Sequence, residues 1–167
     1  MLAGLAVLTL VVGLWGCGSS DRAAPPGAEA DTTARQSLVP GFTFLPPLGE
    51  AQTGSVVLNA EATPVVSIFA GSEVTKPADA KPFVEFGINE ITPQEGLFHV
   101  DWDTGASIGG LAEGTTDCVI EVSWDGVLLG YVDCQVDRTN GKGKKAADLE
   151  FFGLTDGRIL PIKFVIP

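Results

Sequence analysis

The side chains best suited to hold a metal ion lie in one short stretch of the chain. His99 is the only histidine, and Asp101 and Asp103 follow it at alternate positions. Alternate residues of an extended strand share a face and lie about 6.6 Å apart, so two of these side chains could reach one ion. A Ca²⁺ site built from Asp101, Asp103 and a loop carbonyl is the version worth testing. A lone histidine beside carboxylates is also common on a solvated face, and we expect no resident metal.

The run Asp103-Thr104-Gly105-Ala106-Ser107 spells the D-T-G-A-S signature of aspartic proteases. In those enzymes two such loops supply two carboxylates, which share a proton and activate water. A chain with one copy would have to dimerise to build this pair. The preceding residues, Val100-Asp101-Trp102, are not the continuous apolar strand that buries an active carboxylate. We therefore favour a turn at a strand end, in which Asp103 and Thr104 bind local backbone amides.

Other chemistry is weakly indicated. The P-loop and the Cys-x-x-Cys redox motif are both missing from the sequence. The net charge of −11 disfavours nucleic acid as a partner. We expect a protein without enzymatic activity and without a cofactor.

Four of the ten basic residues lie in one expected loop, 137–147, of this acidic chain. Such a loop could dock on an acidic partner or on anionic head groups, mainly by speeding association. A solvated hairpin tip is the alternative. The four residues are Arg138, Lys142, Lys144 and Lys145.

Cys118 and Cys134 flank the clearest expected hairpin, whose turn contains Asp125-Gly126. A two-residue turn would leave Cys118 facing Asp133, whereas a three-residue loop would put Cys118 directly opposite Cys134. We favour the longer loop, because the two apolar faces and a cross-strand disulfide then agree. Two buried free thiols are the alternative.

The tetrapeptide Leu14-Trp15-Gly16-Cys17 ends an uncharged apolar segment. Leu-x-Gly-Cys is the motif at which bacterial lipoprotein precursors are acylated on cysteine and cleaved just before it. The segment 1–16 is shorter than the roughly 20 residues of a membrane-spanning helix and suits a signal peptide. We expect lipidation of Cys17 and a location on the periplasmic or outer side of a membrane, where disulfides persist. An uncleaved anchor helix is the alternative.

Two further segments follow Gly16 in the expected organisation. Residues 17–41 contain almost no bulky apolar side chains, and we expect them to form a flexible tether. Residues 42–167 contain short β-type runs separated by Gly, Pro, Asn and Asp, with no sustained helical period. This pattern predicts an all-β domain: an antiparallel, immunoglobulin-like β-sandwich of seven or eight short strands. Phe42–Leu45 alternates before Pro46-Pro47 breaks it, and eight β-type runs follow: Ser55–Leu58, Val65–Phe69, Phe83–Phe86, Leu97–Trp102, Cys118–Trp124, Leu128–Val136, Leu149–Phe152 and Ile159–Ile166.

Three stretches together resemble an uncharacterised group of exported bacterial β-sandwich modules. Those modules open with F-x-F-L-P-P-L and close with D-G-R-x-L-P-I-K-F, as Phe42–Leu48 and Asp156–Phe164 do here. The third stretch, Val100–Thr104, lies between them. The resemblance covers nearly all of residues 42–167. It implies a β-sandwich and export, and it implies no activity, cofactor or catalytic residue.

These observations predict a membrane-tethered lipoprotein that acts as a structural or accessory subunit of a membrane protein assembly. Modules of the resembling group occur in bacteria that include purple-type phototrophs, so a photosynthetic or respiratory assembly is conceivable. A lipoprotein that captures a small ligand, glycan or ion is the alternative. An aspartic protease acting through Asp103-Thr104-Gly105 is a remote third possibility.

The substitution Cys17→Ser tests the anchor. Because acylation needs the cysteine thiol, we expect the variant to lack acyl chains and to leave the membrane fraction, as measured by mass spectrometry and sedimentation. A variant that stays in the membrane pellet would indicate an uncleaved apolar helix.

Overall fold

The structure, a computed structural model, describes residues 35–52, 57–138 and 151–167. In these ranges the chain forms ten β-strands and no α-helix, which confirms the all-β prediction. No helix there could cross a membrane. The segment 1–16, Cys17 and the three lysines of the basic loop lie outside the described residues. The strands are β1 (Arg35–Ser37), β2 (Thr43–Phe44), β3 (Val65–Ala70), β4 (Val84–Phe86), β5 (Thr92–Gln94), β6 (Leu97–Asp103), β7 (Asp117–Trp124), β8 (Val127–Asp137), β9 (Phe152–Thr155) and β10 (Ile159–Val165).

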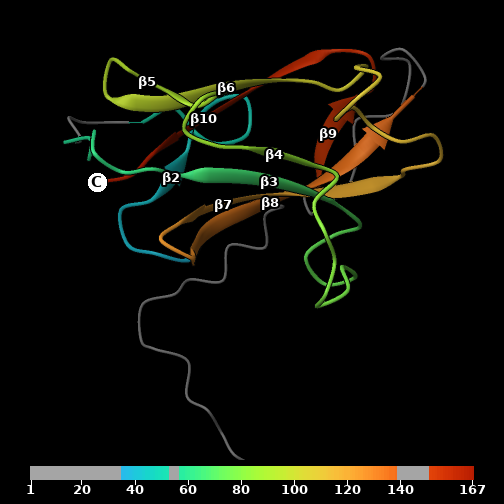
Figure 1. The fold of residues 1–167 in the computed structure, drawn as a ribbon, viewed down its shortest axis with the longest axis horizontal. Helices are drawn as coiled ribbons and strands as arrows, with labels where there is room; N and C mark the ends of the chain where they lie inside the picture. The colour runs from blue at the N-terminus through green and yellow to red at the C-terminus, as the bar shows by residue number, and fades with distance from the viewer. Residues whose placement is uncertain (1–34, 53–56, 139–150) are drawn as a thin grey trace, which may run out of the picture. The chain divides into compact units, whose positions relative to one another are not determined.

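The strands form two sheets that pack as the layers of a β-sandwich (Figure 1). The larger sheet has the order β1-β8-β7-β3-β4, and the smaller has the order β2-β10-β6-β5. β8 pairs with β7 along one edge, while β1 and β9 share its other edge. The β8–β9 pair is parallel and the other pairs are antiparallel. Since β9 and β10 belong to different sheets, the turn at 156–158 connects the two layers.

Two of the ten strands were not expected from the sequence, and β9 shares only Phe152 with the expected run Leu149–Phe152. β1 is entirely polar and lies within the segment expected to be a tether, yet it pairs with residues 130–132 of β8. β5 is exposed, contains Pro93 and lies at an edge of the smaller sheet, so its sequence resembles a loop. Conversely, residues 57 and 58 of the expected Ser55–Leu58 strand are not in a strand. The immunoglobulin-like order of strands stays a prediction.

The core lies between the sheets because strands bury alternate residues. Phe98, Val100 and Trp102 of β6 are buried, and the residues between them point outward. Across the ladder, Ile162 of β10 lies opposite Val100, and Phe164 lies opposite Phe98. The rings of Phe98 and Phe164 stack with their centroids 5.6 Å apart. Aromatic packing of this kind contributes about 0.5–1.5 kcal/mol beyond the area it buries.

The turn of the β7–β8 hairpin has two residues, so the predicted three-residue loop is wrong. Trp124 pairs with Val127, which leaves only Asp125 and Gly126 in the turn. Both have positive φ values, 50° for Asp125 and 76° for Gly126. An Asp-Gly pair tolerates this conformation, and the twist of such a turn matches that of the strands.

The predicted pairing of Cys118 with Cys134 is nevertheless confirmed, because the two lie directly opposite each other. A β-bulge reconciles the short turn with this pairing. The register shifts between Val122 and Ser123, which leaves Leu129 of β8 with no residue directly opposite it on β7. The extra residue moves the rest of β8 by one position, and its inward face then matches that of β7.

Gly130 occupies the point at which β1 and the core come closest to β8. A Cβ atom there would lie 2.5 Å from the carbonyl oxygen of Gln36 and 2.6 Å from Cε1 of Phe42. Both distances are far below van der Waals contact, so any side chain would displace its neighbours. Gly153 in β9 differs, since nothing lies within 4 Å of the equivalent position.

We expect Gly130→Ala to lower the free energy of unfolding by about 1–3 kcal/mol, the usual result of overpacking. The matched change Gly153→Ala should alter it by less than about 0.5 kcal/mol. Urea-induced unfolding of the two variants measures the difference. Equal stabilities would contradict the close approach of β1 and Phe42 to β8.

Candidate functional site

The Asp103-Thr104-Gly105 run forms the turn that ends β6. Oδ1 of Asp103 accepts a hydrogen bond from the backbone N–H of Gly105 at 3.0 Å. The Asp103 side chain is exposed, and it caps the turn through this contact. The expected strand-end turn is therefore confirmed for Asp103.

Thr104 has a different role from the local one expected. Its side chain is buried, with 1% exposure, and lies against the turn between β9 and β10. Its Oγ1 donates to the carbonyl of Arg158 at 2.8 Å and accepts from the N–H of Arg158 at 2.9 Å. The backbone N–H of Thr104 also donates to the Arg158 carbonyl, at 3.0 Å. Thr104 thus fastens the end of β6 to the chain that links the two sheets.

The sequence analysis missed one motif in this loop. Gly105-Ala106-Ser107-Ile108-Gly109 matches the Gly-x-Ser-x-Gly spacing of esterase nucleophiles. In those enzymes the serine lies between a strand and a helix, whereas turns follow β6 here. The only histidine, His99, pairs with Asp101 rather than with Ser107. The match therefore has the spacing of a nucleophile motif without its structural context.

The structure brings together two of the three metal candidates. Nε2 of His99 lies 2.9 Å from Oδ1 of Asp101 on the outer face of the smaller sheet. Asp103 is directed to the Gly105 amide instead. In residues 35–52, 57–138 and 151–167, no three His, Cys, Asp or Glu side chains are grouped so as to hold a metal ion.

Arg138, the one described member of the basic loop, is bound within the fold. Nη2 donates to the carbonyl of Ala112 at 2.6 Å, and Nε lies 3.5 Å from Oδ2 of Asp156. The guanidinium thus joins the end of β8 to two neighbouring loops. Lys142, Lys144 and Lys145 lie outside the described residues, so their docking role stays a prediction.

Cys118 and Cys134 are completely buried in the core between the sheets. Both are free thiols in the structure, so the disulfide stays a prediction. A side-chain hydrogen bond between them, together with burial, holds the pKa of Cys134 well above its usual value. The pair is therefore placed for a disulfide but has little thiolate character as it stands.

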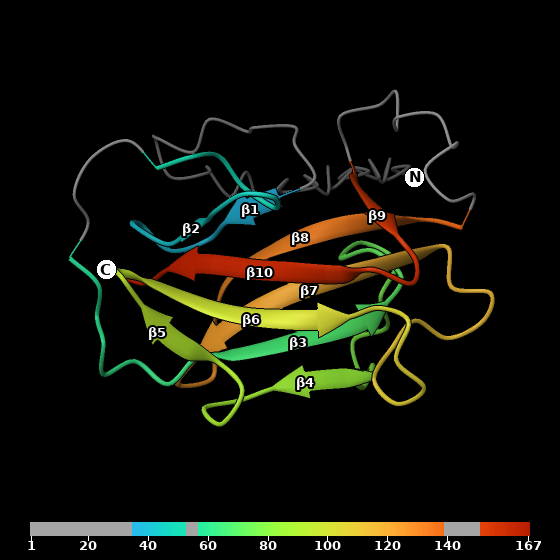
Figure 2. The ribbon, with the colours of Figure 1, turned by 90° about the horizontal axis from the view of Figure 1, so that it is seen from above.

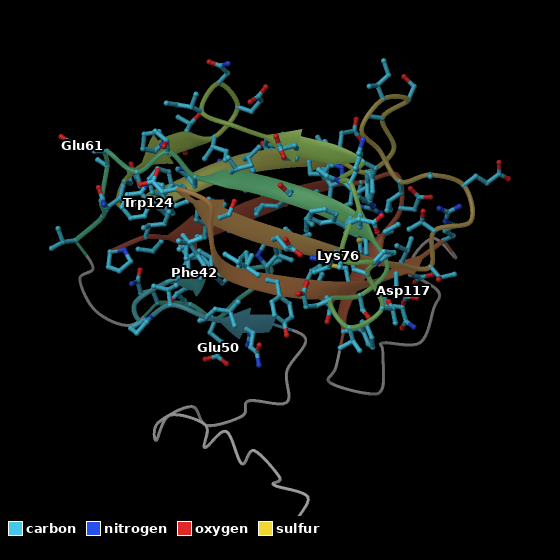
Figure 3. The ribbon with its side chains drawn as sticks, turned by 60° about the horizontal axis from the view of Figure 1, so that its bottom comes forward. Phe42, Glu50, Glu61, Lys76, Asp117 and Trp124 are labelled. Carbon is cyan, nitrogen blue, oxygen red and sulfur yellow. The ribbon has the colours of Figure 1, made fainter. Side chains whose placement is uncertain are left out.

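A charged cluster that the sequence analysis did not predict lies on the outer face of the larger sheet (Figure 3). Nζ of Lys76, in the loop after β3, donates to Glu121 of β7 and to Glu73, the latter at 3.0 Å. The same ammonium lies 4.6 Å from the ring centroid of Phe69. This cation–π contact explains why an aromatic side chain can be buried on a face that points away from the core.

The loop that carries Lys76 is also fastened to β8. The backbone N–H of Glu73 donates to Oδ1 of Asp133 at 2.6 Å. Burial raises the pKa of Asp133, although the hydrogen bond from Glu73 opposes this shift. Burial also raises the pKa of Tyr131, and the nearby charges of Asp133 and Glu73 add to the shift. The contacts give this loop a structural role, namely holding β3, β7 and β8 together from outside.

Comparison of the chain with protein-family models, curated proteins and solved structures found no match. The resemblance of residues 42–167 to exported β-sandwich modules therefore stays a prediction. Function is inferred below from the residues and their contacts.

We expect Thr104→Val to lower the free energy of unfolding by about 1–3 kcal/mol, because the buried hydroxyl of Thr104 supplies both an acceptor for the Arg158 N–H and a donor to its carbonyl. Thr92→Val, at an exposed position of β5, is the matched control and should change it by less than about 0.5 kcal/mol. Thermal unfolding of both variants provides the measurement. A neutral Thr104→Val would show that the junction with Arg158 is not important for stability.

Proposed function

We propose that the protein is a non-enzymatic, membrane-tethered structural subunit of the cell envelope, which docks on other proteins of a membrane assembly. The observation that carries this proposal is the order of its parts: an acylation motif, Leu14–Cys17, followed by one β-sandwich. Acyl chains on Cys17 would hold the domain at the periplasmic or outer side of a membrane. Two or more such chains suffice for stable anchoring.

Further support comes from the side chains whose types could have formed a catalytic or binding site. Asp103 caps a turn, Thr104 is bonded to the turn between the sheets, and Arg138 is paired with Asp156. Each of these side chains is already bound by its own fold. A site for substrate would need such groups free and convergent, which is how catalytic constellations are recognised.

Docking requires exposed apolar side chains whose burial against a partner is favourable. β3 and β6 end and β10 begins at the same end of the sandwich (Figure 2). Three aliphatic side chains in the loops at this end are exposed. We name this region the loop end and define it as residues 71–82, 104–116 and 156–159. Val74 is 90% exposed, Ile108 is 91% exposed and Ile159 is 65% exposed. Exposed apolar side chains gathered at one end of a domain form a surface that a partner can cover.

The opposite end also exposes aliphatic side chains, among them Val57 at 85%. The loop end is favoured because Arg138, the described member of the predicted basic loop, lies there. Arg138 closes β8 beside Ala112 and Asp156, and three lysines follow it within the next seven residues. Apolar anchors at the same end of the sandwich as Arg138 suit a partner surface that is apolar at its centre and acidic around it.

We expect the full-length protein, extracted from native membranes in mild detergent, to migrate on a native gel with a larger complex. Its amount should be stoichiometric with a defined set of subunits by mass spectrometry. Ile108→Asp should weaken this association roughly tenfold, as loss of an apolar contact of about 1.4 kcal/mol does.

The matched variant Val57→Asp adds the same charge at the other end of the sandwich and should leave co-migration unchanged. Loss of association in Val57→Asp alone would move the docking surface to that end. Migration of the wild-type protein by itself would contradict the proposal and favour a lipoprotein that captures a small ligand, glycan or ion.

A further inference from the structure

We propose that Cys118 and Cys134 are joined in the mature protein by a structural disulfide, which closes the β7–β8 hairpin on its core side. The two residues lie directly opposite each other, and both side chains are fully buried. This assigns a covalent modification site that is separate from docking. It rests on the proposed function only for the oxidising compartment in which the bond would form.

The backbone spacing of this pair can be worked out from the neighbouring hydrogen bond. The N–H of Val136 donates to the carbonyl of Thr116 at 2.8 Å, which marks these two as a hydrogen-bonded pair. Hydrogen-bonded and non-hydrogen-bonded pairs alternate along an antiparallel ladder. Cys118 and Cys134, two residues further along each strand, are therefore again a hydrogen-bonded pair.

Cα atoms in hydrogen-bonded pairs lie about 5.5 Å apart. Disulfides usually join Cα atoms about 4.4–6.8 Å apart, most often near 5.5–6 Å. Directly opposed residues share a face of the sheet, so both cysteine side chains point into the core. A disulfide needs Cβ atoms about 3.5–4.5 Å apart, slightly closer than the roughly 4.5–5.5 Å of opposed residues, so forming the bond draws the two strands a little together.

The bulge at Leu129 is what makes this pairing possible. With the two-residue turn at Asp125 and Gly126 and no bulge, Cys118 would face Asp133, and Cys134 would point to the opposite face of the sheet. The bulge shifts β8 by one residue and turns both sulfur atoms into the core. The position of the disulfide is therefore a consequence of an irregularity in one strand.

Burial determines when the bond can form. The attacking species in disulfide exchange is a thiolate, and burial disfavours a thiolate at Cys134. With no exposed surface on either residue, a folded hairpin also excludes the oxidant. The bond must then form while the hairpin is still open to solvent, and once folded it is shielded from reductants.

A small-molecule disulfide such as oxidised glutathione is a sufficient oxidant. One cysteine thiolate attacks it, forms a mixed disulfide and releases one thiolate. The second cysteine thiolate attacks the protein sulfur of that mixed disulfide and releases the second thiolate. The protein loses two protons and two electrons, and the oxidant leaves as two thiols once both thiolates are protonated.

Two measurements on the full chain test the proposal. In the first, the protein is isolated from membranes after acid quenching, alkylated in denaturant and digested without reductant for mass spectrometry. We expect a linked peptide pair containing Cys118 and Cys134, short of two hydrogen atoms and without an alkyl group. In the second, the reduced and denatured chain is refolded in a glutathione redox buffer and should form the same link.

The refolded disulfide form should unfold at a temperature about 10 °C higher than the reduced form, as expected for a closed loop of this size. The double variant Cys118→Ala, Cys134→Ala is the control, and its unfolding temperature should not depend on the redox buffer. The comparison of oxidised with reduced wild type needs no substitution, so it stands if the variant folds poorly.

Two alkylated thiols after refolding, or links between separate chains, would overturn the disulfide. Protein that is reduced when isolated but forms the link on refolding would have a different meaning. That result would support the geometry of the pair but would overturn the disulfide in the mature protein, together with the oxidising compartment proposed for it. The two failures can therefore be distinguished.

Discussion

The register of the β7–β8 hairpin is the constraint on which the rest of the sandwich depends. Side chains alternate along a strand, so a shift of one residue would move every apolar side chain of β8 to the wrong face. The two-residue turn at Asp125-Gly126 sets one register between β7 and β8. Burying the apolar faces of both strands on the same side requires a register one residue different. The bulge at Leu129 satisfies both, and it leaves β8 in register with β1 and β9 on its other edge. Phe42 packs against Gly130, and Asp133 holds the loop after β3.

A second junction ties the two sheets together. The chain crosses from β9 in the larger sheet to β10 in the smaller one, and Thr104 at the end of β6 binds the crossing at Arg158. Arg138 reinforces the same region through Asp156. Residue types that elsewhere form catalytic or binding sites are used here to join the layers. This is why an Asp-Thr-Gly run can be present in a chain for which we propose a structural role.

The sequence was most informative where burial follows a simple alternation. Phe98, Val100 and Trp102 predicted β6 and its inward face correctly, because that strand is regular. The pairing of Cys118 with Cys134 in the hairpin was predicted correctly, but the length of its turn was not. A bulge has no recognisable sequence signal in an apolar run such as Leu128-Leu129. The all-polar β1 could not be predicted, because its pairing is supplied by the edge of β8. The contacts of Thr104 with Arg158 and of Lys76 with Glu121 join residues 54 and 45 positions apart, and spacing in the sequence does not show such contacts.

The central claim is that this domain is held at a membrane in order to dock through its loop end. Site-specific photo-cross-linking in native membranes tests this most directly, with the reactive residue placed at Ile108 or, in a second protein, at Val57. Both positions are exposed, so reactivity alone would not distinguish them. We predict that position 108 gives one dominant cross-linked product with a membrane-complex subunit and that position 57 gives none. Equal products from both positions, or none from position 108, would contradict docking through the loop end.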